Sequence, residues 1–146
     1  MRSSSDPRLR FADITDQILG AFFEVYNDLG PGLAEKVYER ALIHELRRRG
    51  CDVSAQHPLS MRYGQAKVGR FRADLLVEGK VLVEIKARTR ILKGHWAQLL
   101  HYLAVSGIEV GLLLNFGPQP GFKRLVLTAT DRSVDQLRRP PPNGHG

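Results

Sequence analysis

Residues 72–86 read RADLLVEGKVLVEIK, and the expected fold of the chain follows from this stretch. Two short apolar runs, 75–77 and 81–85, lie on either side of a charged turn that contains Gly79. Apolar runs of strand length around a glycine turn are typical of a β-hairpin. We therefore expect two neighbouring strands here, apolar enough to be buried on both faces.

Three charged residues interrupt these apolar strands. Asp74 lies on the first strand, and Glu84 and Lys86 lie on one side of the second. An unpaired charge in such a place costs several kcal/mol or is neutralised, so charges there suggest a site. The alternative is an ion pair between Glu84 and Lys86 on an exposed edge strand, with Asp74 capping a turn.

The length of the hairpin loop decides whether the two carboxylates meet. A two-residue loop would put Asp74 and Glu84 on opposite faces of the sheet. A three-residue loop, with Gly79 as the left-handed residue of a bulged turn, pairs Leu76 with Lys80. We favour this second register, which makes Asp74 a diagonal neighbour of Glu84 on one face. Two carboxylates within about 7–8 Å can share a hard cation such as Mg²⁺, which prefers oxygen ligands.

The composition is that of one globular domain. With 146 residues, of which 42% are hydrophobic and 25% charged, the chain can bury a single core. No apolar run approaches the ~20 residues of a membrane span, and the first residues, MRSSSDPRLR, carry no secretory signal. We therefore expect a cytoplasmic protein that does not associate with membranes. The single cysteine, Cys51, excludes an internal disulfide and a metal site built on cysteine.

The net charge of +7 is compatible with a polyanionic partner such as nucleic acid. Part of this charge lies in a basic, proline-rich tail at residues 132–146, which we expect to be disordered. With a flexible arm at residues 1–12, this leaves residues 13–131 as one folded domain. The better candidates for phosphate contacts are the arginines that flank the hairpin, namely Arg70, Arg72, Arg88 and Arg90.

Two amphipathic helices are expected before the hairpin. Apolar residues recur at steps of three and four over residues 13–29 and again over residues 34–49. The segment Gly30-Pro31-Gly32 ends the first helix, because glycine adopts the left-handed cap and proline cannot continue the turn. The other expected elements are a strand with an irregular middle at 51–63, a turn at 64–69, a helix from about 95 to 107, and strands at 108–116 and 122–130. The expected order is α-α-β-β-β-α-β-β, an α/β (α+β) fold with a mixed central β-sheet flanked by helices.

Two motifs resemble those of a known family. Asp74, followed after nine residues by EIK at 84–86, resembles the D-(x)n-E-x-K signature of the PD-(D/E)XK nuclease superfamily, with Ala73 where many members have proline. Residues 32–38, GLAEKVY, have the form G-x-x-E-x-x-Y. With their neighbours they resemble the bacterial GxxExxY proteins, a family assigned to that superfamily. The likeness covers roughly residues 14–116.

This resemblance implies a restriction-endonuclease-like core and a nuclease site. Asp74 and Glu84 would hold Mg²⁺ or Mn²⁺ together with the backbone carbonyl of Ile85, and Glu35 would join them from the second helix. Lys86 would orient the attacking water or stabilise the charge that develops on the phosphate. The catalytic residues would then be Asp74, Glu84 and Lys86. An alternative for Glu35 is to satisfy the N-terminus of its own helix.

The helix after the hairpin carries Gln98 and Tyr102, which share a face because they are four residues apart. This Q-x-x-x-Y pattern resembles a motif of the superfamily's exonuclease branch, where the pair lies beside the site. The resemblance implies that both residues bind the substrate. We expect Arg72 and Arg88 to bind it as well, through its phosphates. Packing in the core is the alternative for Tyr102.

Two functions remain open. The first is a metal-dependent nuclease that hydrolyses phosphodiester bonds of nucleic acid, with DNA favoured over RNA. The second is a noncatalytic module that binds nucleic acid or another partner and retains the nuclease fold. Since small nucleases of this fold often pair, a homodimer is also left open.

Overall fold

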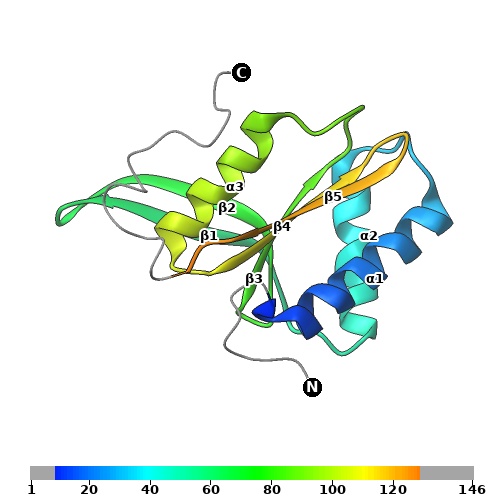
Figure 1. Cartoon of the computed structure of the whole chain (residues 1–146), viewed down its shortest axis with the longest axis horizontal. Coiled ribbons are helices and arrows are strands. Elements are labelled where there is room, and N and C mark those ends of the chain that lie inside the picture. Colours follow the sequence, from blue (N-terminus) through cyan, green and yellow to red (C-terminus); the bar gives the residue numbers. More distant parts are fainter. Residues whose placement is uncertain (1–8, 129–146) are drawn as a thin grey trace.

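In a computed structural model that describes residues 9–128, a five-stranded mixed sheet lies between helices (Figure 1). The elements in chain order are α1 (Ala12–Leu29), α2 (Glu35–Arg48), β1 (Val53–Tyr63), β2 (Ala66–Val77), β3 (Val81–Lys86), α3 (Lys93–Ser106), β4 (Val110–Phe116) and β5 (Pro120–Val126). The sheet has the order β1-β2-β3-β4-β5, in which β3 and β4 are parallel and all other neighbours antiparallel. The predicted element order and mixed sheet are confirmed. Residues 1–8 of the expected arm and the expected tail at 132–146 lie outside the described residues.

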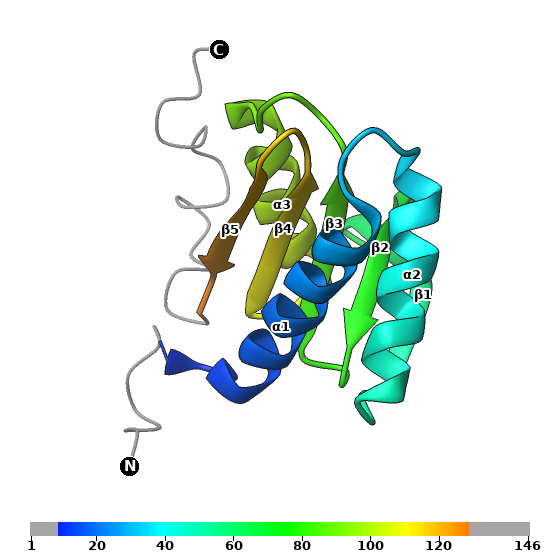
Figure 2. The same ribbon diagram turned by 90° about the vertical axis from the view of Figure 1, so that its right-hand side faces the viewer.

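Different helices cover the two faces of the sheet. α1 and α2 lie on one face and α3 on the other (Figure 2). Successive strand residues point to opposite faces. Val83 and Ile85 of β3 accordingly pack with α1 and α2, while Leu82 packs with Leu99 and Leu103 of α3. The even-numbered residues of β3 therefore belong to the α3 side.

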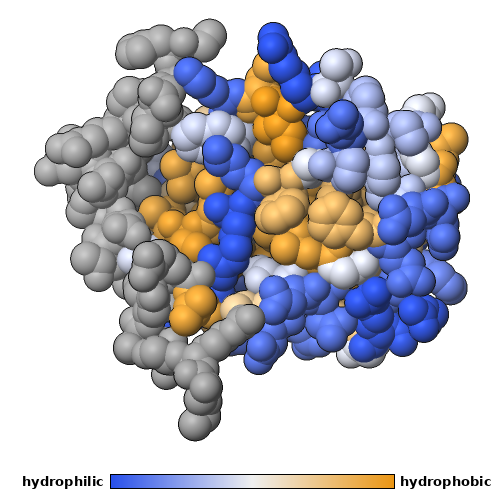
Figure 3. All heavy atoms as spheres, turned by 45° about the vertical axis from the view of Figure 1, so that its right-hand side comes forward, coloured by the Kyte–Doolittle hydropathy of each residue, from blue (hydrophilic) through white to orange (hydrophobic). Residues whose placement is uncertain are grey.

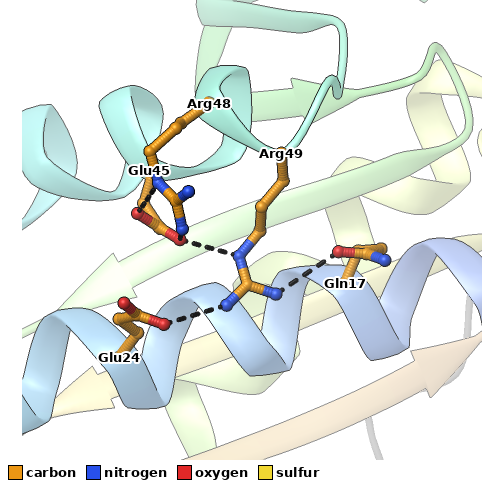
Figure 4. A network of polar contacts seen from close by, with 5 residues as sticks. All are labelled: Gln17, Glu24, Glu45, Arg48 and Arg49. Atoms are coloured by element: carbon orange, nitrogen blue, oxygen red, sulfur yellow. Dashed lines mark hydrogen bonds and ion pairs between the residues drawn. The ribbon is translucent and has the colours of Figure 1, made fainter.

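A polar network joins α1 to the end of α2 (Figure 4). The guanidinium of Arg49 donates to Glu45 of α2 at 2.8 Å and to Glu24 of α1 at 3.2 Å. Gly20 of α1 makes room for this guanidinium, because a Cβ there would lie 2.8 Å from Arg49 Nη1. Hydrogen bonds from Arg48 and then Arg49 lower the pKa of Glu45 to about 2. The network therefore depends on an ionised Glu45.

The β2–β3 loop has three residues, as predicted, but its register differs from the prediction. Leu76 pairs with Leu82 rather than with Lys80. Both Glu78 (φ 55°) and Gly79 (φ 65°) are left-handed and form the centre of the turn. Lys80 is therefore the last loop residue instead of the first paired one. The pairing moves by two residues, which keeps the parity of the strands.

The β1–β2 hairpin is longer than the sequence predicts. β2 begins at Ala66, whereas a turn was expected over residues 64–69. The far end of this hairpin extends beyond the helices (Figure 1). Its side chains face solvent, with Tyr63 and Val68 82% and 57% exposed. A strand without a buried face shows no apolar alternation in its sequence, which is why the turn prediction was wrong.

The two edge strands depart from regular pairing or from their expected limits. β1 has the irregular middle that was expected, at Gln56 with φ 51°. β5 begins at Pro120 rather than at residue 122, and residues 129 and 130 of the expected strand lie outside the described part of the chain. Of the helices found over residues 9–128, none combines the length and apolar character needed to cross a membrane. On the face drawn in Figure 3, apolar side chains form separate patches between hydrophilic ones.

Candidate active site between β2 and β3

Strands β2 and β3 part at one end, and two carboxylates take over the hydrogen bonding there. Backbone pairing stops at Leu75 and Val83. One step further, the backbone N–H of Asp74 donates to Glu84 Oε2 at 2.7 Å, and that of Ile85 donates to Asp74 Oδ2 at 2.7 Å. Each carboxylate thus binds the backbone of the opposite strand. We call this reciprocal pair, Asp74 and Glu84, the fork.

Strand alternation is interrupted at Asp74. Ala73 packs in the cluster on the α3 side, whereas Leu75 packs on the side of α1 and α2. In a regular strand these two residues would share a face. The neighbouring strand β1 is irregular at the same level, at Gln56. The interruption turns Asp74 toward the backbone of β3 and brings its carboxylate to Glu84.

Burial works against ionisation of the fork. Burial, followed by repulsion from Asp74, raises the pKa of Glu84 to about 8. Burial also raises the pKa of Asp74, against the hydrogen bond from Ile85 and with added repulsion from Glu39. The ammonium of Lys86 favours ionisation of both carboxylates but does not offset their burial. Two carboxyl groups in this situation bind either a proton or a cation.

Two glutamates of α2 approach the fork in different ways. Glu35, the predicted ligand, is exposed and accepts a hydrogen bond from Ala87 N at 3.2 Å, so it reaches the end of β3. Glu39 is 6% exposed and accepts a hydrogen bond from Gln56 Nε2 at 2.9 Å. Its charge also contributes to the raised pKa of Asp74. Glu39 was not among the predicted site residues, although its spacing of four from Glu35 puts both on one helix face.

The G-x-x-E-x-x-Y residues build the corner that brings Glu35 to the sheet. Gly32 has φ 100°, a conformation that favours glycine. The Tyr38 hydroxyl donates to Gly30 O, and its ring stacks on Phe116 of β4 with 4.3 Å between ring centroids. The tyrosine therefore fixes the α1–α2 loop against the sheet, and with it the start of α2.

α3 lies along the other side of the fork. Tyr102 is 7% exposed, and burial followed by the charges of the two fork carboxylates raises the pKa of its hydroxyl. Gln98, one turn earlier, is exposed. Burial followed by the charges of Lys86 and Arg88 lowers the pKa of His95. Tyr102 and His95 therefore lie within electrostatic reach of the site, whereas Gln98 is at the surface.

The four arginines predicted to contact phosphates are all exposed, namely Arg70, Arg72, Arg88 and Arg90. Arg88 belongs to residues 87–92, which we call the connecting loop because they join β3 to α3. The side chain of Asn115 in β4 donates to Arg88 O and accepts from Arg88 N, both at 2.9 Å. A Cβ at Gly117 would lie 2.2 Å from Arg88 O, so glycine is required there. These contacts fix the connecting loop beside the end of β4.

The fork offers the oxygen ligands that Mg²⁺ and Mn²⁺ prefer. Within residues 9–128, no group of three or more His, Cys, Asp or Glu side chains is arranged to hold a metal ion. The candidate ligands are then the two fork carboxylates, completed by backbone oxygen and by the waters that Mg²⁺ usually retains. The raised pKa of Glu84 fits a cation there, because a divalent charge would offset the repulsion between the carboxylates.

Comparison with known proteins points to one family. A family model described as the PD-(D/E)XK nuclease superfamily matches residues 12–125. Four chains among the solved structures also match. One of them, described as "Crystal structure of SSO0001", has a TM-score of 0.51 and 18% sequence identity, and the alignment covers 82% of this chain but 61% of that one. At this identity the likeness shows the fold alone. No curated protein matches the chain.

Proposed function

This chain belongs to the PD-(D/E)XK nuclease superfamily, and from that premise we propose that it hydrolyses phosphodiester bonds of nucleic acid at the fork. One observation carries the proposal: two reciprocal hydrogen bonds of 2.7 Å hold Asp74 and Glu84 across the gap between β2 and β3. Groups held in this way are preorganised, so they need little rearrangement when the substrate arrives. Lys86 lies on the same side of β3 as Glu84.

We assign the fork carboxylates and the backbone carbonyl of Ile85 to a divalent cation, Mg²⁺ or Mn²⁺. When bound, such a cation lowers the pKa of a water molecule and offsets charge on the phosphate. Glu84 must lose its proton to become a ligand, so binding is coupled to proton release. Glu35 is assigned to a second cation or to its water, and the buried Glu39 holds negative charge next to Asp74.

Lys86 is assigned to the reacting phosphate and the attacking water, because an ammonium is a compact cationic donor. Tyr102 and Gln98 are assigned to substrate contacts on the α3 side. Arg72 and Arg88, exposed before and after the fork in the chain, bind phosphates of the same strand.

The finer identity of the protein belongs to the same proposal. Residues 32–38 support membership of the GxxExxY proteins, since Gly32, Glu35 and Tyr38 each have a distinct role in the α1–α2 corner. DNA as the favoured substrate and a cytoplasmic location rest on the sequence alone, and a homodimer stays an open expectation.

A noncatalytic nucleic-acid-binding module is the second candidate. One observation favours it: among the described residues, no third His, Cys, Asp or Glu completes a metal-binding group with the fork. Such a module would keep the exposed arginines and the fold but would have no use for a cation.

Calorimetric titration of Mg²⁺ or Mn²⁺ beside a cleavage assay separates the two candidates. We expect cation binding with proton release, and cation-dependent cleavage of nucleic acid. Lys86→Met should abolish cleavage while the cation still binds, and Lys80→Met in the β2–β3 loop is the matched control that should cleave normally. Nucleic-acid binding with neither cation binding nor cleavage would establish the module instead.

A further inference from the structure

A pocket of about 410 Å³ opens beside the connecting loop. Its volume lies in the range of roughly 300–1,000 Å³ that is usual for ligand sites. The lining combines basic and aromatic side chains from the connecting loop, α3 and β5, and none of the lining residues is acidic. The members that matter here are Arg90, Lys93, Trp96, Asn115 and Lys123.

The pocket lies one strand away from the end of β3 that carries Glu84 and Lys86. Asn115 pairs with Lys86 in the parallel register of β3 and β4. Their backbones are therefore one strand spacing apart, about 4.8 Å. Asn115 also fixes the backbone of Arg88, from which the chain continues to Arg90 in the pocket wall. A nucleic-acid strand with one phosphate at Lys86 therefore reaches the pocket with its neighbouring nucleotides.

Both parts of a nucleotide find matching groups in this pocket. Lys123 Nζ lies 5.2 Å from the centroid of the half-buried Trp96 ring, which is the aromatic face of the pocket. Phe122 borders the pocket, but its ring lies edge-on to Phe23 of α1, at 6.3 Å between ring centroids, on the other face of the sheet. Aromatic faces stack on bases of any sequence, and the cations beside them bind phosphates. An acidic peptide would pair with the cationic side chains of the pocket but would leave the aromatic ring without a base to stack on. The bases of an intact duplex are stacked on one another and present no free face to an indole.

We infer that this pocket binds an unpaired nucleotide next to the scissile phosphate. The substrate is then a single strand, or a duplex with a single-stranded extension. The inference rests on the proposed function and narrows its substrate class. It adds Trp96 and Lys123 to the residues that bind substrate.

Trp96 is the only tryptophan of the chain, so its fluorescence reports on this pocket. The full-length protein is titrated with a short oligothymidylate, with a blunt duplex of the same length, and with a poly-glutamate peptide. The titrations contain Ca²⁺ in place of Mg²⁺, because Ca²⁺ takes the same oxygen ligands. Fluorescence anisotropy of labelled oligonucleotides gives an independent measurement of binding. We expect oligothymidylate to quench Trp96, and the blunt duplex and the peptide to leave its fluorescence nearly unchanged.

Two variants test the contacts separately. Trp96→Leu should weaken oligothymidylate binding about tenfold, because stacking on an aromatic ring supports each base, and should leave duplex binding unchanged. Lys123→Ala keeps the fluorescent ring and should lower the salt dependence of single-strand binding by about 0.7 in the logarithmic slope. Lys80→Ala is the matched control, because Lys80 Nζ lies 5.6 Å from the Phe11 ring in a similar pair outside the pocket. This control should change neither quantity.

The possible failures are distinguishable. Oligothymidylate that binds without changing Trp96 fluorescence, a Trp96→Leu protein that binds it like the parent, or equal quenching by poly-glutamate would overturn the inference. The proposed function survives each of these results as long as nucleic acid is cleaved with Mg²⁺. If no nucleic acid binds or is cleaved, the proposed function fails and the inference fails with it.

Discussion

Replacing Glu84 by Gln should stabilise the metal-free protein in alkali and leave its stability unchanged in acid. Burial and then repulsion from Asp74 raise the pKa of Glu84 from 4.5 to about 8. Because the folded pKa lies above the unfolded one, the native state binds this proton more tightly. The stabilisation is complete below pH 4.5 and is lost as the pH rises to about 8. Above that, the parent must bury a charge that the amide of Gln avoids.

The magnitude follows from the size of the shift. Each pKa unit corresponds to about 1.4 kcal/mol, so a rise from 4.5 to about 8 sets an upper limit of about 5 kcal/mol. Asp74 titrates together with Glu84 and carries part of this free energy, so we expect a gain of about 2–3 kcal/mol for Glu84→Gln at about pH 9. The Gln oxygen can still accept the hydrogen bond from Asp74 N, so the fork itself is preserved.

Urea unfolding in EDTA at about pH 4 and about pH 9 measures both free energies of unfolding. Glu109→Gln, which removes a carboxylate just before β4, controls for the loss of one negative charge. Mg²⁺ or Mn²⁺ should raise the stability of the parent at pH 9 and not that of the variant, which should also fail to cleave. A variant that is several kcal/mol less stable than the parent at pH 9 would refute the reasoning. Glu84 would then be one half of a buried ion pair with Lys86.

Three further predictions concern the surroundings of the fork. Gly117→Ala should destabilise the protein by about 1–3 kcal/mol in urea unfolding, because its Cβ would meet Arg88 O at 2.2 Å, and an unchanged midpoint would contradict the close approach. The pKa of Glu45 is lowered from 4.5 to about 2, so the ionised Glu45 stabilises the folded protein. This stabilisation is complete above pH 4.5 and is lost as the pH falls toward 2. The advantage of the parent over Glu45→Gln in melting temperature should therefore disappear across that range, and a constant difference would argue against the network. Arg72→Ala and Arg88→Ala should each lower the slope of nucleic-acid affinity against salt by about one, and slopes equal to that of the parent would remove these residues from the phosphate contacts.

The sequence predicted the element order and the meeting of the two carboxylates, because both depend on periodicity. A shift of the strand pairing by two residues leaves Asp74 and Glu84 on the same face of the sheet. The prediction that the two carboxylates meet is therefore right, although the predicted register is wrong. The reversal of facing at Asp74 could not be predicted. The residues after it, Leu75 and Leu76, are both apolar, so the sequence does not mark which of them faces which helix.

Contacts between segments distant in the chain could not be predicted from the sequence either. The sequence predicts an irregular middle for the strand that contains Gln56, but not that the Gln56 side chain donates a hydrogen bond to Glu39 of α2. Asn115 looks like an ordinary strand-end residue until the connecting loop folds back to meet both ends of its amide group. Such contacts depend on which distant segments come together in the folded chain, and local patterns in a single sequence do not show this.

The fork has a consequence for how this lineage can evolve. Its carboxylates are also the ties between two central strands, so selection for folding alone would preserve hydrogen-bond acceptors at positions 74 and 84. A descendant that had ceased to cleave would keep them, as carboxylates or as amides. Lys86 is less constrained by folding, since it acts on the fork through its charge and its ammonium makes no hydrogen bond within residues 9–128. It should be the first of the three to drift, so the residue found at its position distinguishes working enzymes from inherited scaffolds.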